Sequence, residues 1–364
     1  LHEGLLEVDL APWSGLTINE VKKKFPDEYL LWQTAPKELT LIRDNEEKYK
    51  PILELRNQAK DFLEELIKNH PLKNNETVIL VGHNAILRCI ILYLIGEPNQ
   101  GFRRIKLDNA SISVINIVKE NEIGLNVQIE CLNNTTHLSK RLPKKSDSAR
   151  LILVRHGETD WNLQGRFQGQ IDIPLNKNGK NQALAAGDFL REEKIDVAYS
   201  SSLSRPLETT KLILNEHPDV KITLMNDLIE IGHGLWEGKL ESEIKDKWAK
   251  MLSDWKEKPD RVNMPEGESI QEVWERSVKC WTKICSSLSS KQVALVVAHD
   301  AVNKTIICHL LGLESSNIWM VKQGNGGITV IDIAAESNQP DIITCLNLTS
   351  HLGSVIDSTA TGAL

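Results

Sequence analysis

Several features that mark other protein classes are scarce in this sequence. The six cysteines form no Cys-x-x-Cys pair and most sit among apolar residues, which predicts reduced core thiols of an intracellular protein. The longest apolar run, near Cys89–Ile95, is far shorter than the ~20 residues that a membrane span needs. Lys and Arg number 43 against 50 Asp and Glu, so the net charge is −7. Without a long basic block, nucleic acid and anionic membranes are poor candidates as partners.

What remains is typical of a globular protein. The 364 residues are 41% apolar and 26% charged, and at roughly 150 residues per domain they suggest two domains. Residue 1 is Leu rather than Met, so a targeting signal cannot be judged from this end. We expect a cytoplasmic protein, or one of the plastid stroma if the source is a photosynthetic eukaryote.

An internal repeat organises the chain. The segment Val78–Ile86 resembles Val293–Val302, and this match places His83 on His299 at a spacing of 216 residues. Upstream the spacing becomes 223 residues, because the first copy carries seven extra residues between Pro36 and His83. Further matched pairs are Glu7 with Glu230, Trp13 with Trp236, Gly15 with Gly238, Asn109 with Asn325, and Cys131 with Cys345. So many matches in register indicate a tandem duplication.

The repeat predicts the domain boundaries. Residues 1–138 correspond to the later part of one domain, residues 139–150 form a polar and turn-prone linker, and residues 151–364 form a complete second domain. Leu1 aligns with Leu224, well inside the second copy. We therefore expect the full protein to start at least ~70 residues earlier, the length that would complete the first repeat.

The second copy alternates apolar runs with helical patterns. Expected strands are 151–154, 195–199, 293–298 and 328–333, and expected helices are 182–190, 205–214, 269–288 and 302–311. This alternation predicts an α/β domain, a three-layer sandwich with a mostly parallel sheet and helices on both faces.

Charged and polar side chains follow three of these strands. Arg155 and His156 come directly after the first strand, Arg205 follows the second within Ser-Ser-Ser-Leu-Ser-Arg, and His299 follows the third. Ligands bind at the carboxyl ends of parallel strands, so these side chains could converge in one pocket. A positively charged pocket rich in hydrogen-bond donors suits a phosphoryl group. For the Arg-His pair alone, a structural histidine beside a solvated arginine is the simpler interpretation.

The motifs together resemble those of the histidine phosphatase superfamily, the phosphoglycerate mutase-like group. The similarity rests on Arg155-His-Gly-Glu-Thr-x-Trp-Asn162, on Ser-Ser-x-Leu-x-Arg205 and on Ala-His299, and it covers residues 151 to about 333. The resemblance implies that His156 becomes phosphorylated during turnover. It also implies that Arg155, Arg205 and His299 hold the phosphoryl group, with Asn162 as a further donor.

The same resemblance gives Glu230 the role of general acid and then of base toward water. Burial would raise the pKa of this carboxyl and the neighbouring cations would lower it, and the sequence does not decide between them. A surface carboxylate is the alternative, and the recurrence as Glu7 is expected under both interpretations. No His-Glu-x-x-His pattern or other metal-ligand spacing is present, so we expect no metal and no cofactor.

The reaction and the substrate are less determined. The short Trp236-Glu-Gly form looks like the phosphatase branch, and a phosphoglycerate mutase-type transfer is the alternative. The tandem layout resembles plant phosphatases acting on 2-carboxy-D-arabinitol 1-phosphate, and the second copy resembles cyanobacterial enzymes that include a metal-independent phosphoserine phosphatase. We expect a small phosphorylated metabolite as substrate, with contacts from Gln168, Gly169, Trp236 and residues 323–327.

The first copy keeps only the acid and the late histidine, as Glu7 and His83. It has no counterpart of Arg-His-Gly or of Ser-x-Leu-x-Arg in this chain, so alone it should not catalyse. A scaffold, a regulatory half or a homodimer surface are its possible roles.

Overall fold

The computed structural model describes residues 1–71, 76–96, 101–121, 124–139, 141–334, 336 and 339–360. The chain divides into two compact units. Unit 1 comprises Leu1–Asn109, Ile117–Val127 and Glu336–Pro340. Unit 2 comprises Ala110–Asn116, Gln128–Ala335 and Asp341–Leu364. The last strand of the first repeat therefore contributes residues from Gln128 onward to the unit that holds the second repeat.

A mixed sheet forms the centre of unit 2, with the strand order β3-β4-β10-β9-β5-β8-β6-β7. Its strands are β3 (Ile112–Asn121), β4 (Gly124–Asn134), β5 (Arg150–Arg155), β6 (Val197–Ser201), β7 (Ile222–Met225), β8 (Val293–Ala298), β9 (Ile328–Asp332) and β10 (Ile342–Leu348). Strands β5, β8, β6 and β7 run parallel to one another, whereas β9, β10 and β4 pair antiparallel with their neighbours. Strands β5 and β8 are buried along their whole length, as expected of parallel strands covered on both faces.

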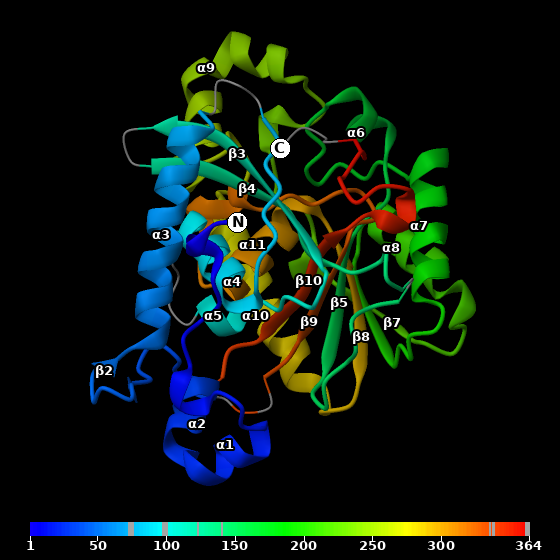
Figure 1. Cartoon of the computed structure of the whole chain (residues 1–364). Coiled ribbons are helices and arrows are strands. Elements are labelled where there is room, and N and C mark those ends of the chain that lie inside the picture. Colours follow the sequence, from blue (N-terminus) through cyan, green and yellow to red (C-terminus); the bar gives the residue numbers. More distant parts are fainter. Residues whose placement is uncertain are drawn as a thin grey trace. The chain divides into compact units, whose positions relative to one another are not determined.

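The helices of unit 2 are α6 (Asp160–Gln164), α7 (Lys177–Leu190), α8 (Ser204–Ile213), α9 (Glu241–Glu257), α10 (Ile270–Ser287) and α11 (Asp300–Leu311). Among them, α7, α8 and α11 flank the sheet (Figure 1). Residues of α7 and α8, among them Leu190 and Ile213, join one core with alternate residues of β5, β8 and β9. The expected α/β sandwich is confirmed. In the described part of the chain, no helix is both long enough and apolar enough to cross a membrane.

The expected elements are present, with differences at their ends. The helix expected over 182–190 begins five residues earlier, at Lys177. The second strand begins at Val197 rather than Ile195. The last of the expected helices begins at Asp300 rather than Val302, since His299 has extended backbone angles and accepts from the amide of Asn303. Arg150, at the end of the expected linker, opens β5 and forms a buried ion pair with Asp332 of β9 at 2.6 Å.

Unit 1 is mainly helical. It contains the short 3-10 helices η1 (Glu3–Leu5) and η2 (Ala11–Trp13), the helices α1 (Ile18–Lys24), α2 (Pro26–Thr34), α3 (Pro51–Asn69), α4 (Asn84–Leu94) and α5 (Gly101–Arg104), and the hairpin of β1 (Leu41–Ile42) with β2 (Lys48–Tyr49). One core forms around Trp13, Val21, Leu39, Leu41 and Tyr49. Helix α3 buries one apolar face, which includes Leu55, Phe62 and Leu63.

The two repeats differ at one strand. In unit 2, Val293–Ala298 is the fully buried strand β8, which lies between β5 and β6. Its counterpart, residues 77–82, forms no strand, and Ile79 and Val81 are 83% and 84% exposed.

Candidate active site

The chain places four charged or polar side chains at the ends of three parallel strands. Arg155 closes β5 and His156 follows it, Arg205 lies in the first turn of α8 after β6, and His299 precedes α11 after β8. Because β5, β8 and β6 are adjacent and parallel, their ends meet at one edge of the sheet. His156, Arg205 and His299 are 2%, 1% and 0% exposed. The convergence proposed from sequence is therefore present.

The hydrogen bonds of His156 fix which ring nitrogen carries the proton. Nδ1 lies 2.7 Å from the carbonyl oxygen of Gly157, and Nε2 lies 3.3 Å from Nε of Arg205. A carbonyl oxygen can only accept and a guanidinium can only donate, so Nδ1 bears the proton and Nε2 presents its lone pair. Burial, and then the charges of Arg205 and Arg155, hold the pKa of His156 well below its usual range. The ring is therefore neutral, and the lone pair of Nε2 faces Arg205.

The two arginines are held by backbone oxygens. Arg205 donates from Nη2 to Gly169 at 2.8 Å and from Nη1 to Ile171 at 3.1 Å. Arg155 donates from Nη1 to the carbonyl oxygen of Gln323 at 2.6 Å, and its buried Nε has no partner among the described residues. These carbonyl oxygens orient both guanidinium groups without neutralising them, and Nη1 of Arg155 also lies 3.5 Å from a carboxylate oxygen of Asp300.

Glu230 is buried beside this charge. Its Oε1 accepts from the amide of Ile231 at 2.9 Å, and its Oε2 accepts from the amide of Asp300 at 3.1 Å. Burial raises the pKa of Glu230, and the carboxylate of Asp300 raises it further, while Arg205 and Arg155 oppose the shift. The sequence left the direction open, and in the structure burial prevails, so the pKa of Glu230 is raised.

His299 completes the cluster. Its ring centroid lies 5.0 Å from that of His156 in an edge-to-face arrangement, and its Nε2 lies 2.9 Å from Oγ of Ser201. Burial, followed by the charge of Arg205, holds the pKa of His299 well below its usual range. The ring is therefore neutral, and its other nitrogen, Nδ1, has no partner among the described residues.

The expected substrate contacts lie in different surroundings. Asn162 is buried near His156, and its Oδ1 accepts from Asn325, which also donates to the backbone oxygen of His156. Gln168 is 7% exposed, and Gly169 has a positive φ of 57° that aims its carbonyl oxygen at Arg205. Trp236 is fully buried and packs in an aromatic cluster with Phe167 and Trp248. Its indole is thus surrounded by other side chains.

No group of three or more His, Cys, Asp or Glu side chains is arranged to hold a metal ion in the residues that the structure describes. The histidines of the site instead face arginines, a serine hydroxyl and a backbone oxygen.

The family profile described as "histidine phosphatase superfamily (branch 1)" matches residues 1–128 and again 151–344. The chain belongs to the histidine phosphatase superfamily. The two-part match also confirms the tandem duplication inferred from the repeat. Both copies of this histidine phosphatase chain are therefore recognisable as members of one family.

Curated relatives are phosphatases of this family, with mutases also among them. Phosphoserine phosphatase 1 of Hydrogenobacter thermophilus is 36% identical over 204 residues, which are 56% of this chain and 94% of the relative. A probable 2-carboxy-D-arabinitol-1-phosphatase of Arabidopsis thaliana is 33% identical over 199 residues, 54% of this chain but only 41% of the plant protein. A 2,3-bisphosphoglycerate-dependent phosphoglycerate mutase of Bartonella henselae is 31% identical over 173 residues, 46% of this chain and 84% of the mutase.

A solved structure supports the same fold. The α-ribazole phosphatase of Shigella flexneri aligns with a TM-score of 0.50 at 26% identity, over 54% of this chain and 96% of that protein. The match covers nearly the whole of a single-domain relative and about half of this chain, as expected for a duplicated histidine phosphatase.

Several groups that support the histidine phosphatase site were not found from the sequence. Ser201 contacts His299, Thr209 accepts from the amide of Gly157, and Arg276 of α10 donates to the backbone oxygens of Ile229 and Glu230. Ser201 lies at the end of a strand, and this position could have identified it from the sequence as a residue of the site. Thr209 and Arg276 sit on ordinary amphipathic helices, where nothing local distinguishes them from other polar residues.

The first-copy residues lie in unit 1, and Glu7 repeats the geometry of Glu230. Its Oε1 accepts from the amide of Val8 at 2.9 Å and from the amide of Ala85 in α4 at 3.1 Å. Gln58 supports this loop as Arg276 does in unit 2, by donating to the carbonyl oxygens of Gly4 and Leu6. Glu7 and His83 are exposed, whereas Glu230 and His299 are buried.

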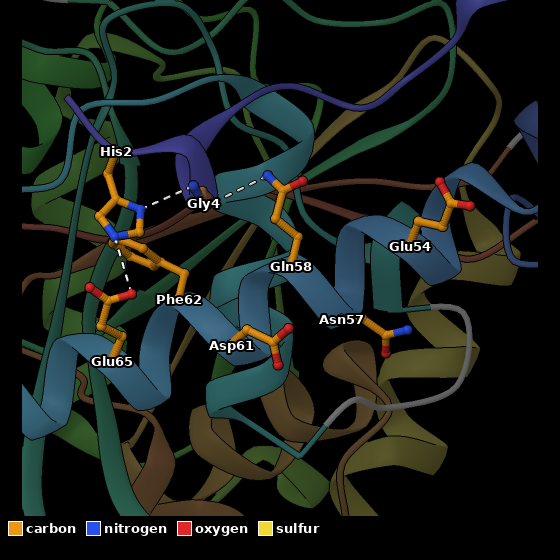
Figure 2. A pocket seen from close by; sticks show the side chains of 8 residues that line it. All are labelled: His2, Gly4, Glu54, Asn57, Gln58, Asp61, Phe62 and Glu65. Carbon is orange, nitrogen blue, oxygen red and sulfur yellow. Dashed lines mark hydrogen bonds and ion pairs between the residues drawn. The ribbon is translucent and has the colours of Figure 1, made fainter.

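A hollow in unit 1 is a different feature. Figure 2 shows that it opens along α3 beside His2, with Gln58 donating toward Gly4 and Glu65 facing the imidazole of His2. Its lining includes three carboxylates but neither Glu7 nor His83. It is separate from the first-copy counterparts.

Proposed function

We propose that this protein is a phosphatase that hydrolyses a small phosphorylated metabolite through a phosphohistidine formed on His156. Sugar phosphates, phosphorylated sugar acids and phosphoserine are the substrate class, in keeping with the names of its relatives. The observation that carries the proposal is the state of His156: a neutral buried ring, its proton fixed on Nδ1 and its Nε2 facing Arg205.

The first step forms one bond and breaks another. Nε2 of His156 attacks phosphorus while the bond from phosphorus to the leaving oxygen breaks. Arg155 and Arg205 stabilise the negative charge on the phosphoryl oxygens, and neutral His299 can donate to one of them. Glu230 gives its proton to the leaving oxygen, for which its raised pKa prepares it.

The second step regenerates the enzyme. Glu230, now a carboxylate, takes a proton from water, and the water oxygen attacks phosphorus as the bond to Nε2 breaks. Inorganic phosphate leaves and His156 is again neutral. These residues complete both steps without a metal ligand or an organic cofactor, so we propose metal-independent turnover.

The same pocket could return the phosphoryl group to a second hydroxyl, as in a phosphoglycerate mutase. The presence of mutases among the relatives supports this alternative. The short Trp236-Glu-Gly segment favours water as the acceptor. Isomerisation of a phosphoglycerate without phosphate release would establish the mutase reaction instead.

One experiment tests the proposal. Phosphate release should be measured with phosphoserine, sugar phosphates, phosphoglycerates and a carboxylated pentitol phosphate, with and without EDTA. We expect turnover of at least one compound, unchanged by the chelator, and a trapped acid-labile phosphoenzyme. Both signals should disappear in His156→Ala. Robust turnover in that variant would exclude the phosphohistidine mechanism.

For the first repeat we propose a non-catalytic role in this chain, as a scaffold or regulatory half. Glu7 keeps its hydrogen bonds, but no Arg-His-Gly segment is matched to it in the sequence. Glu7→Gln and His83→Ala should each leave kcat within twofold of the wild type. A larger loss would mean that the first repeat takes part in the chemistry.

A further inference from the structure

Where a strand of the first repeat pairs with a strand of the second, an asparagine on each strand donates to a backbone oxygen of the other strand. β4 pairs antiparallel with β10 at Leu132 and Leu346, in unit 2. Asn133 donates from Nδ2 to the carbonyl oxygen of Thr344 at 2.7 Å, and Asn347 donates to that of Glu130 at 2.8 Å. Both asparagines have positive φ, 53° and 50°. The first-copy strand is thus built into the sheet of the second copy.

Glu130 of β4 is a buried carboxylate with three sets of donors. It is 2% exposed and accepts from Nζ of Lys322 at 2.9 and 3.1 Å. It also accepts from the amide of Asp357 at 2.9 Å and from Nδ2 of Asn116 at 2.9 Å. Lys322 and Asp357 belong to separate parts of the second copy, so Glu130 joins the two.

Each of these parts reaches the active site. Lys322 begins a loop, residues 322–327, whose Gln323 carbonyl accepts from Arg155 and whose Asn325 donates to the backbone oxygen of His156. Asp357 lies in the C-terminal segment, from which Oγ1 of Thr359 accepts from the amide of Asn325. The amide of Gly324 donates to Oδ1 of Asn347, the same asparagine that bonds to Glu130.

We propose that Glu130 is a positioning residue of the active site, and that the first repeat thereby sets the placement of Arg155 through residues 322–327. This proposal rests on the phosphatase function proposed above, and it gives the first repeat a role in that function. Glu130 itself touches neither His156 nor its partners. It acts by holding Lys322 from one side and the C-terminal segment from the other.

The test removes the charge of Glu130 while keeping its size. In Glu130→Gln, Lys322 loses its closest counter-charge. The first residue of the loop 322–327 is then no longer held in place by an ion pair. We expect KM to rise and kcat/KM to fall by between about 10-fold and 100-fold, the range for small misplacements of binding groups. The inhibition constant of inorganic phosphate should rise by a similar factor. Lys322→Met should reproduce the effect.

Controls separate positioning from a loss of folding. Glu192→Gln removes a carboxylate from an exposed ion pair with Arg141 and should change nothing. In Glu130→Gln, hydrogen exchange should quicken in residues 322–327 and 353–360 but not in β5 or β8. The double variant Glu130→Gln/Lys322→Met should lose less than the two single effects combined, because neither Glu130 nor Lys322 is then left without the charge of the other. If Glu130→Gln does not fold, Lys322→Met and the charge-keeping Glu130→Asp supply the same comparison.

The outcomes remain distinguishable from those of the phosphatase proposal. A wild-type chain that releases no phosphate from any compound would contradict the phosphatase function, and exchange in residues 322–327 would still report on Glu130. Unchanged KM, phosphate inhibition and loop exchange in Glu130→Gln would overturn the positioning role. A lowered melting temperature with unchanged KM would overturn it as well, since it would reveal a merely structural strand.

Discussion

Nε of Arg205 lies 3.3 Å from Nε2 of His156, the nitrogen that we propose attacks phosphorus. The same guanidinium is anchored by the carbonyl oxygens of Gly169 and Ile171. A phosphoryl group arriving between the two residues would meet the lone pair and the positive charge together. Arg205 would therefore orient the phosphoryl group toward Nε2 of His156.

Arg205→Lys should be far from conservative. Lysine keeps the charge but cannot donate to two carbonyl oxygens and to the phosphoryl group from one planar fork. We expect kcat/KM to fall by at least about 100-fold, as for a misplaced catalytic group. Steady-state kinetics measure this. The matched control is Arg166→Lys, whose exposed partners lie outside the strand-end cluster, and an equal loss there would contradict the argument.

Asp300→Asn should move the alkaline limb of the pH profile. Glu230 must be protonated to act as the acid, and the carboxylate of Asp300 helps to raise its pKa. Removing that charge lowers the pKa of Glu230, so activity should be lost at lower pH than in the wild type. Profiles of kcat against pH test the sign. Asp246→Asn, an exposed change on α9, should leave the limb in place.

The carboxylate of Asp300 is already paired with two cations, so we expect its replacement to act mainly on its immediate neighbours. Its Oδ2 lies 2.7 Å from Nζ of Lys304 and its Oδ1 lies 3.5 Å from Nη1 of Arg155. An alkaline limb that moves upward in Asp300→Asn would show that the asparagine disturbs the arginine more than it relieves Glu230.

Gly169→Ala should reduce stability and activity together. The residue has a φ of 57°, and an added Cβ would clash with the carboxylate of Glu237. We expect a loss of at least about 1–2 kcal/mol in the free energy of unfolding from the left-handed backbone alone. Gly165→Ala is the matched control, because Gly165 has a φ of 68° and open space around it. Equal losses of activity in the two variants would rule out a role for the Gly169 carbonyl.

Asp332→Asn should destabilise the second copy. Its carboxylate pairs with both nitrogens of the Arg150 fork, at 2.6 and 3.0 Å, and Arg150 is 1% exposed. Breaking one side of a buried pair costs about 3–5 kcal/mol. Urea denaturation measures it against Glu192→Gln, whose exposed pair should contribute ~0–1 kcal/mol. If both variants lost a similarly small free energy of unfolding, the buried pair would be no more stabilising than the exposed pair.

Acid should weaken the fold through buried histidines. Burial lowers the pKa of His233 to about 3, so the folded protein does not take up the proton that the unfolded chain binds below a pKa of about 6.5. The free energy of unfolding should then fall as pH drops below 6.5, by up to about 1.4 kcal/mol per pH unit for each such residue. His233→Leu should show a shallower dependence in urea denaturation between pH 6.5 and 5. An unchanged slope would contradict this linkage.

The sequence predicted β5, β6, β8 and β9 and the residues that follow three of them, but it did not predict β3, β4, β7 or β10 of the same sheet. The apolar runs that became β5 and β8 are buried on both faces, so pattern alone identifies them, and Arg155, His156 and His299 follow them directly. The proton on Nδ1 of His156 and the raised pKa of Glu230 could not be read in advance. Both depend on a carbonyl oxygen, a backbone amide and burial, which no residue type encodes.

The role of β4 was hidden for another reason. The repeat assigns Glu130 to the first copy, and only the pairing at Leu132 and Leu346 brings it to Lys322.

The antiparallel pairing of β4 with β10 also bears on how the protein can be divided for laboratory work. A truncated chain that begins at residue 139 would leave β10 as a bare edge, with its unpaired amides and carbonyl oxygens facing water. Such edges recruit other strands, and a second truncated molecule offers an identical one. Removing the first repeat to simplify the enzyme would therefore favour self-association and aggregation over a well-behaved single domain.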